Sequence, residues 1–230
     1  MTSTIYISAL ANKSLTEYLR HKGFALHLLN GNGSPVYSQV STHADIHMCQ
    51  LGLWEKSQLF PGNTKNLGGN YPGNIIYNAV CTGKYFIHNL RYTDPMLIEA
   101  ARLWHETGFP GQPFIKINVK QGYTRCCCLP VDDTSFITSD RGIARSLTEA
   151  GACVLTISEG NIDLPGFDYG FIGGCAGHLI IDGRRTVVFN GDLSSHPDYE
   201  KIAAFIKDRD IDLKFFDDHT LMDIGSILCG

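Results

Sequence analysis

Cysteine and histidine are the residue types in this sequence best suited to covalent chemistry. Cys175 follows Gly173 and Gly174, which leave room for a substrate or a backbone segment to approach closely. A thiolate at this position could act as a nucleophile. His178 could pair with it only across a bulge, because residues three apart on a regular strand point to opposite faces. The alternative is that Cys175 is a small buried apolar residue.

Two other cysteines occupy comparable positions. Cys229 lies in a predicted strand after Ser226-Ile227-Leu228, and Cys126 follows Thr124-Arg125 in its own segment. Either could be the nucleophile, or could simply pack within a sheet. Our first choice is Cys175.

A second group of reactive side chains is His43, Asp45, His47 and Cys49, which alternate along the chain. If this segment is a strand, its period of two places all four on one face. They could line a polar channel with His43 as acid and base, or lie on a solvated face. A metal site would need partners from elsewhere, because four ligands on one straight strand cannot surround an ion.

Several polar residues precede predicted strands and could hold a substrate. Asp168 could bind a guanidinium group in a bidentate pair, or it could be a turn residue. If the strands share one centre, their polar starting residues converge there and form a binding cleft. The candidates are Asp45, Asn78, Lys120, Tyr123 and Asp168.

The elements that would position these residues repeat along the chain. Four segments each predict a strand, a helix and a second strand, with first strands at 5–8, 85–88, 136–139 and 186–189. The helix that follows Asp94-Pro95 has a capping carboxylate and a proline at its first position. Segments 80–85, 129–134 and 180–185 are typical of hairpins, the last through Asp182-Gly183. The predicted unit is therefore ββαβ.

The two ends of the chain each predict a strand without a local partner. Pairing 223–229 with 4–8 would close a ring and remove two exposed edges. A fifth, degenerate unit would begin at His43, where the sequence from Pro61 to Gly73 predicts a loop in place of a helix. We expect a single α/β domain over residues 1–230, built as a ring of about five ββαβ units.

This arrangement resembles the pentein fold, or α/β-propeller, of the guanidino-group-modifying superfamily. That superfamily includes arginine and agmatine deiminases, dimethylarginine hydrolase and amidinotransferases. The segments Asn118–Thr124 and Phe167–Cys175 also resemble an uncharacterised bacterial family with this fold.

The resemblance implies a specific chemistry. In these enzymes a cysteine attacks the guanidinium carbon, a histidine moves protons and carboxylates hold the cation, without a cofactor. Their His-x-Asp motif corresponds to His43-Ala44-Asp45 here, and their cysteine follows a glycine-rich strand start, as Cys175 and Cys229 do.

Composition excludes several classes of partner. The formal net charge of -4 gives no basic surface for nucleic acid. No apolar run is long enough to span a bilayer, and the first residues do not resemble a signal peptide. We therefore expect a cytoplasmic protein with reduced cysteines and a small-molecule substrate or ligand. The sequence predicts neither a metal nor a cofactor, and it leaves the oligomeric state open.

Two functions fit these observations. One is a cysteine-dependent hydrolase, deiminase or amidinotransferase acting on a guanidine or amidine, with Cys175 as nucleophile, His43 or His178 as acid and base, and Asp45 and Asp168 as substrate ligands. The other is a non-catalytic protein of the same fold that binds a ligand or a protein. Catalysis predicts that one cysteine, one histidine and one carboxylate share a cleft, whereas a binding protein predicts thiols scattered through the packing. A metal hydrolase is a third, weaker hypothesis.

Overall fold

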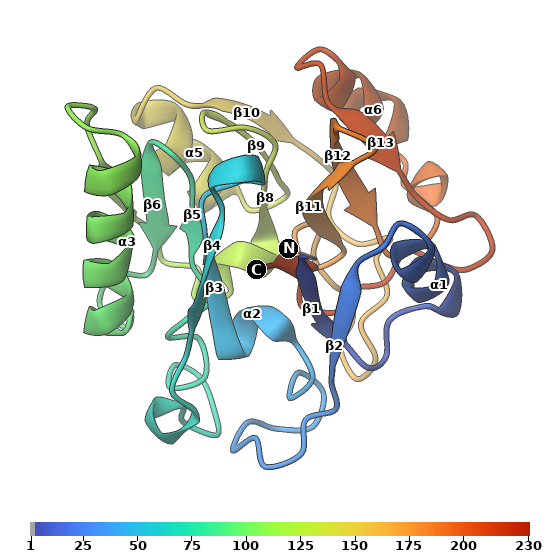
Figure 1. Ribbon diagram of the computed structural model, residues 1–230, viewed down its shortest axis with the longest axis horizontal. Helices are drawn as coiled ribbons and strands as arrows, with labels where there is room; N and C mark the ends of the chain where they lie inside the picture. Colours follow the sequence, from blue (N-terminus) through green and yellow to red (C-terminus); the bar gives the residue numbers. More distant parts are fainter. Residues whose placement is uncertain (1–2) are drawn as a thin grey trace.

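The computed structural model describes residues 3–230 and shows a mixed α/β architecture of several small sheets (Figure 1). Helices α1, α3, α5 and α6 lie toward the outside of the view, and the strands lie nearer its middle. Within the described residues the α-helices are α1 Lys13–His21, α2 Ala44–His47, α3 Pro95–Gly108, α4 Thr124–Cys127, α5 Arg141–Glu149 and α6 Tyr199–Lys207.

Four sheets contain the strands of residues 3–230. Their orders are β14-β1-β2, β10-β9-β8, β11-β12-β13 and β4-β3-β5-β6-β7. The strands are β1 Thr4–Ser8, β2 Ala25–Leu29, β3 Met48–Leu51, β4 Gln58–Pro61, β5 Val80–Cys81, β6 Tyr85–His88, β7 Ile115–Asn118, β8 Cys128–Pro130, β9 Ser135–Thr138, β10 Cys153–Thr156, β11 Ala176–Ile181, β12 Arg184–Phe189, β13 Asp212–Lys214 and β14 Leu228–Cys229.

The predicted ββαβ unit is confirmed in three continuous segments. In each, an antiparallel hairpin is followed by a helix and a parallel third strand: β5-β6-α3-β7, β8-β9-α5-β10 and β11-β12-α6-β13. Local chemistry explains the boundaries. Asp94 caps α3 by accepting hydrogen bonds from the backbone N–H groups of Met96 and Leu97. Asp182 and Gly183 both have positive φ, as the β11–β12 hairpin turn requires.

The predicted pairing of the chain ends is also confirmed. Strand β14 runs antiparallel to β1, with Ile5 opposite Cys229 and Tyr6 opposite Leu228. A fourth unit, β14-β1-α1-β2, is thereby completed by strands from opposite ends of the chain. Strand β14 is shorter than predicted, since it spans only Leu228 and Cys229, and Ile227 before it forms an isolated β-bridge with Gly177.

The degenerate fifth segment differs from the sequence prediction. The prediction of a strand from His43 to Cys49 is wrong. Residues 44–47 form the single turn of α2, and the strand β3 begins only at Met48. Strand β3 then pairs with β4 and β5, without a flanking helix of its own. Because one helical turn replaces four extended residues, the predicted common face of His43, Asp45, His47 and Cys49 does not form.

The sequence predicts that the last helix begins at Ser195, close to Pro197, but the helix begins later. Residues Leu193–Ser195 form a 3₁₀ turn, and α6 starts at Tyr199, beyond Pro197.

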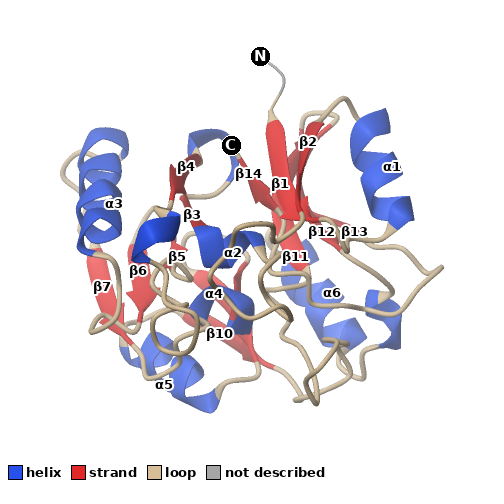
Figure 2. Cartoon of the chain, turned by 90° about the horizontal axis from the view of Figure 1, so that it is seen from below, coloured by secondary structure: helices blue, strands red, loops and turns tan. Residues whose placement is uncertain are grey.

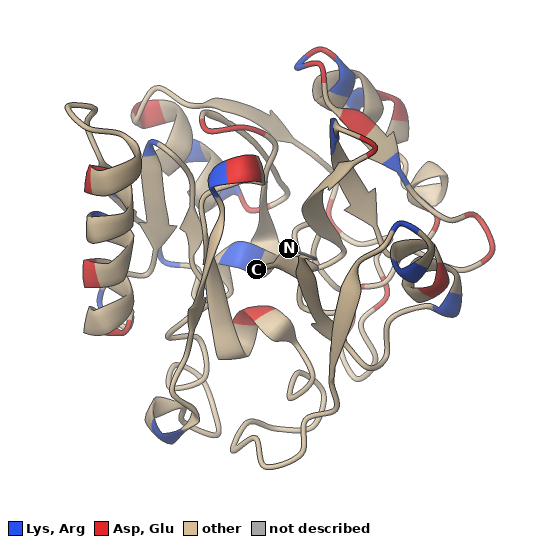
Figure 3. Cartoon of the chain, viewed as in Figure 1, with Lys and Arg blue, Asp and Glu red and all other residues tan. Residues whose placement is uncertain are grey.

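Charged side chains gather on the outer helices and loops, whereas α2 and α4 each bring one charge toward the centre (Figure 3). Figure 2 shows these two short helices near the middle of the molecule, among loops.

Candidate functional site

Five chain segments meet at the centre of the molecule through direct hydrogen bonds. Each segment lies just before an inner strand, namely β3, β5, β8, β11 or β14. Backbone N–H groups donate to carbonyls of the next segment, and the Asn78 side chain completes the path. The bonds run from Asp45 N to Gly225 O (3.1 Å), Ser226 N to Gly174 O (2.8 Å), Gly174 N to Cys126 O (3.1 Å), Arg125 N to Asn78 O (3.1 Å) and Asn78 Nδ2 to Asp45 O (3.3 Å). We call this closed path the central circuit.

A cysteine, a histidine and a carboxylate lie together beside the central circuit. Ligand atoms of His43, Cys126 and Asp223 all lie within 4.8 Å of one another, and all three residues are buried. The His43 Nδ1 to Asp223 Oδ1 distance is 4.0 Å. His43 immediately precedes α2 and Cys126 lies in α4, so the two single-turn helices position the pair.

Two polar side chains of the circuit hold the thiol. Cys126 donates from Sγ to Asp45 Oδ2 over 3.0 Å, and Asn78 Nδ2 lies 3.4 Å from the same sulfur. Ser226 also donates to Asp45 Oδ2, over 2.6 Å. The other oxygen, Asp45 Oδ1, is buried and has no hydrogen-bond partner among residues 3–230. Buried carboxylate oxygens are normally hydrogen-bonded, so this orphaned acceptor beside the thiol is unusual.

Burial controls the ionisation of these groups. It raises the pKa of the Cys126 thiol well above its usual value, and Asp45 and Asp223 raise it further by charge repulsion. Burial also lowers the pKa of His43 to about 4 and raises that of Asp223 to about 6. At neutral pH the site therefore holds a protonated thiol, a neutral imidazole and an ionised Asp223.

The trio faces a cavity of about 330 Å³ with largely aromatic walls. The Tyr123 hydroxyl lies 2.7 Å from that of Tyr37 and accepts a hydrogen bond from Asn74 over 2.8 Å, which fixes one wall. Asp168 adds a second carboxylate to the lining. The lining residues include Tyr37, His43, Tyr123, Cys126, Phe167, Asp168, Tyr169, Phe171 and Asp223.

Glycines make the close approach of these segments possible. A Cβ atom at Gly174 would overlap the carboxylate of Asp223, and one at Gly225 would overlap the His43 side chain. Gly225 also has a φ of 69°, which disfavours other residues. The glycines before Cys175 therefore make room for Asp223 and for the backbone around Cys126.

Comparison with known proteins places the chain in a family. Residues 53–228 match the model of DUF6873, a family of unknown function. The chain belongs to this family. The DUF6873 match contains Cys126 and Asp223 and begins after His43 and Asp45. No curated protein matches the sequence.

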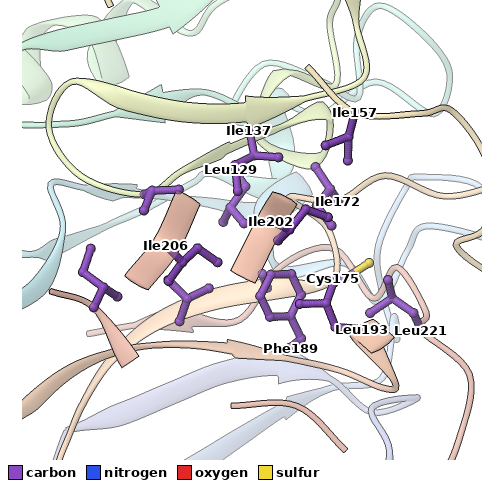
Figure 4. Close-up of a cluster of buried hydrophobic side chains, with 14 of the residues drawn as sticks. Leu129, Ile137, Ile157, Ile172, Cys175, Phe189, Leu193, Ile202, Ile206 and Leu221 are labelled. Carbon is purple, nitrogen blue, oxygen red and sulfur yellow. The ribbon is translucent and has the colours of Figure 1, made fainter. Parts of the chain in front are cut away.

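The cysteine of our first choice lies outside the cavity. Cys175 is 0 % exposed in an apolar cluster with Ile172, Phe189 and Leu221 (Figure 4). Its thiol donates to the Phe171 carbonyl over 3.2 Å. Burial raises its pKa well above the usual value. This environment favours packing over nucleophilic attack.

His178 and Cys229 are also placed away from the trio. The His178 ring makes a 2.5 Å hydrogen bond from Nε2 to the Pro130 carbonyl and meets Trp54 edge-on. Cys229 lies in β14, where its N–H donates to Gln50 Oε1. Neither residue lines the aromatic cavity.

Four of the five predicted substrate ligands lie at the candidate site. Tyr123 and Asp168 line the cavity, and Asp45 and Asn78 contact Cys126. Lys120 is exposed and contributes its carbonyl to a hydrogen bond with Asn89 instead. Asp223 was not among the predicted site residues. In the sequence it is an acidic residue in a predicted terminal strand, and no motif around it indicates a site.

The trio also has the donor types that zinc takes, namely imidazole, thiolate and carboxylate. The three could hold an ion only after the thiol loses its proton.

Within residues 3–230, no helix has the length and apolar character needed to cross a membrane.

Proposed function

We propose that the protein is a thiol-dependent enzyme acting on a small molecule with a guanidinium or amidinium group, with Cys126 as nucleophile. The observation that carries the proposal is that Cys126, His43 and Asp223 share one cavity with Asp168. A cysteine, a histidine and carboxylates in one cleft are the arrangement that the enzyme hypothesis requires. The proposed nucleophile is therefore Cys126, in place of Cys175, which was the first choice from the sequence.

A pentein-like ring is part of this proposal. The repeated ββαβ units, the pairing of β14 with β1 and the five segments of the central circuit support it. In such a ring the segments before the inner strands are equivalent, which accounts for the convergence of Asp45, Asn78, Cys126 and Ser226. The free cysteines among the described residues favour a reducing compartment such as the cytoplasm.

Charge and shape favour a planar cation as substrate. Aromatic walls attract delocalised cations, and the carboxylates of Asp168 and Asp223 can accept N–H groups in paired hydrogen bonds. A cation next to Cys126 would also lower the pKa of its thiol, offsetting the repulsion from Asp45 and Asp223. The substrate therefore helps to activate its own nucleophile.

The reaction then proceeds in two steps. The thiol proton passes to neutral His43, and the thiolate forms a C–S bond to the planar carbon. His43 returns the proton to the departing nitrogen as the C–N bond breaks. In the second step an incoming nucleophile such as water gives a proton to His43 and attacks the carbon. The C–S bond breaks and Cys126 recovers its proton.

One observation favours the alternative of a non-catalytic binding protein. The Cys126 thiol is already hydrogen-bonded to Asp45, and its pKa is raised in the absence of a ligand. A cavity with a protonated thiol can bind a cation without reacting with it. The two functions differ in whether a bound cation makes Cys126 reactive.

Alkylation with two matched reagents tests this difference. 2-Chloroacetamidine is a planar cation, and 2-chloroacetamide is its neutral counterpart. Mass spectrometry at pH 7.5 gives the rate of Cys126 alkylation by the amidine divided by the rate by the amide. This ratio should be at least about tenfold larger than the same ratio for glutathione, because lowering the thiol pKa by one unit raises the thiolate population about tenfold. Cys153, the exposed thiol, accepts a hydrogen bond from Arg209 and serves as the surface comparison within the same molecule.

Variants identify the groups responsible. Cys126→Ser should abolish the selective labelling, whereas the matched variant Cys175→Ser should retain it. Asp168→Asn should reduce the preference for the cationic reagent. Equal labelling of Cys126 by both reagents, or labelling of Cys153 alone, would contradict the enzyme proposal.

A further inference from the structure

Three asparagines in the chain are each followed by a glycine, namely Asn30, Asn32 and Asn190. Asparagine is one of the thermally unstable residue types. In its commonest reaction the backbone nitrogen of the next residue attacks the carbonyl carbon of the asparagine side chain. A glycine offers the least hindrance to this approach because it has no Cβ atom. The sequence therefore contains three sites for the same reaction, and their surroundings decide which of them reacts.

Asn190 is fixed in the interior of the protein. It is buried, its Oδ1 atom accepts a hydrogen bond from the Asn12 backbone N–H over 3.0 Å, and its Nδ2 atom donates to the Met222 carbonyl over 3.1 Å. Gly191 is buried as well, and a Cβ atom there would overlap the Thr220 carbonyl oxygen. Cyclisation at Asn190 would break both side-chain hydrogen bonds in a place that water does not reach, which is costly. The fold therefore protects this site.

Asn32 lies at the tip of a turn in the loop between β2 and α2, which runs along the lower edge of Figure 1. The Ser34 backbone N–H donates to the Gly31 carbonyl over 3.1 Å and closes this turn around Asn32 and Gly33. Both tip residues are exposed, and within residues 3–230 neither the Asn32 side chain nor the Gly33 N–H makes a hydrogen bond. A Cβ atom at Gly33 would meet nothing within 4 Å, so the two reacting atoms can approach each other in open space.

Asn30 is also exposed, but its surroundings restrain it. Its Oδ1 atom accepts a hydrogen bond from the Asn32 backbone N–H over 3.0 Å. Gly31 is only partly exposed, and a Cβ atom there would overlap the Ser41 hydroxyl oxygen. The Gly31 nitrogen can reach the Asn30 side chain only if this hydrogen bond breaks and the packing against Ser41 loosens. Asn30 should therefore react more slowly than Asn32.

We propose that Asn32 is a site of spontaneous deamidation, and that the fold ranks the three asparagines in the order Asn32, Asn30, Asn190. The Gly33 nitrogen loses its proton and bonds to the carbonyl carbon of the Asn32 side chain, and the side-chain nitrogen leaves as ammonia. Water then opens the resulting imide at one of its two carbonyl carbons and yields aspartate or isoaspartate. Water is the only other reactant.

Either product changes a loop that leads to the candidate site. Each product replaces a neutral amide with a carboxylate, and isoaspartate also adds one methylene group to the backbone. The same loop continues to Tyr37 and Val40, which line the aromatic cavity. Aged protein should therefore contain more acidic forms that differ from fresh protein in this loop.

Mass spectrometry of the full-length protein tests the proposed order. The protein is kept at mildly alkaline pH and body temperature, and samples are digested at mildly acidic pH, where further deamidation is slow. Fragmentation then locates each replacement of NH₂ by OH. We expect Asn32 to convert at least about fivefold faster than Asn30, which is the factor that one ordinary hydrogen bond supplies. Asn190 should show no conversion while the protein stays folded.

Unfolding and substitution separate the effect of the fold from that of the local sequence. In urea all three sites lose their surroundings, so Asn190 should become reactive and the rates at Asn30 and Asn32 should become similar. Asn32→Gln should remove the main acidic form that ion-exchange chromatography detects in aged protein. The matched variant Asn30→Gln should retain that form.

Two results would overturn the proposal. If Asn30 or Asn190 reacts as fast as Asn32 in the folded protein, the fold does not rank the three sites. If Asn32 stays unmodified in the folded protein but reacts in urea, the turn protects Asn32 and the proposed site is wrong.

Discussion

Gly174 is the position at which a single methyl group would most directly disturb the reactive trio. A Cβ there would overlap the Asp223 carboxylate, which accepts hydrogen bonds from the backbone N–H groups of Phe171 and Gly225. Gly174→Ala should therefore lower the free energy of unfolding by about 1–3 kcal/mol, the usual cost of overpacking. It should also abolish the cation preference in Cys126 alkylation.

Gly108 provides a matched control for this substitution. It ends α3, and a Cβ there meets nothing within 4 Å. Gly108→Ala should leave the labelling unchanged and should not lower stability, since alanine favours the helix by about 0.5–1 kcal/mol. Urea denaturation and the alkylation assay measure both variants. If Gly174→Ala matched the wild type in both assays, the close packing of Asp223 would have no functional role.

At the scale of elements, two single-turn helices decide which side chains reach the site. The alternation of His43, Asp45, His47 and Cys49 has the period of a strand, yet α2 forms there. As a result, His43 lines the cavity and Asp45 holds Cys126, whereas His47 makes a hydrogen bond to the Ser41 carbonyl and Cys49 joins the apolar core. An alternation of only four side chains is too short to distinguish a strand from one helical turn.

The short strand β14 should contribute strongly to stability, because it joins the two ends of the chain. Leu228 is 1 % exposed and lies opposite Tyr6 of β1. Leu228→Ala should lower the free energy of unfolding by about 2–5 kcal/mol, as is typical of buried leucines. Urea denaturation measures this loss.

Cys229 is the matched neighbour, since it lies in the same strand but is only partly buried. Cys229→Ala should cost much less stability and should leave Cys126 labelling intact. Equal losses for the two variants would mean that burial of Leu228 does not account for the contribution of β14.

At the scale of the whole molecule, buried histidines should make stability depend on pH. Burial lowers the pKa of His43 and His88 to about 4 and that of His178 to about 3. Because the folded-state pKa lies below the unfolded value of about 6.5, the unfolded chain binds more protons in this range. The stabilisation is therefore present above pH 6.5 and is lost as the pH falls toward 4. Asp223, whose pKa is raised to about 6, acts in the opposite direction between about pH 4 and 6.

Burial also raises the pKa of Asp45, which acts in the same direction as Asp223. Three histidines outweigh these two carboxyl groups, so the unfolding free energy should fall by several kcal/mol from pH 7 to pH 4. His178→Gln keeps a donor for the Pro130 carbonyl and removes one titrating group. Its unfolding free energy, measured by denaturation across this pH range, should vary less steeply than that of the wild type. An unchanged slope would show that protonation of His178 does not drive acid unfolding.

The sequence by itself determined the repeated ββαβ units and their order along the chain, but not the single-turn helices α2 and α4. These features depend on neighbouring residues, such as the Asp94 cap of α3 and the Asp182-Gly183 turn, so local patterns are sufficient to predict them. The pairing of the two ends also followed, because each end offered a strand without a local partner. His43, Asp45, Asn78, Tyr123 and Asp168 were predicted as site residues and lie at the candidate site.

Only the tertiary structure decided which cysteine joins them. Cys126 lies 81 residues from Asp45, and Ser226 lies 181 residues from the same carboxylate. No local pattern encodes contacts at such separations, because they depend on how several sheets pack around one centre. For the same reason, the glycines beside Cys175 gave a misleading signal: they accommodate Asp223 and the backbone near Cys126, which the sequence does not place beside them.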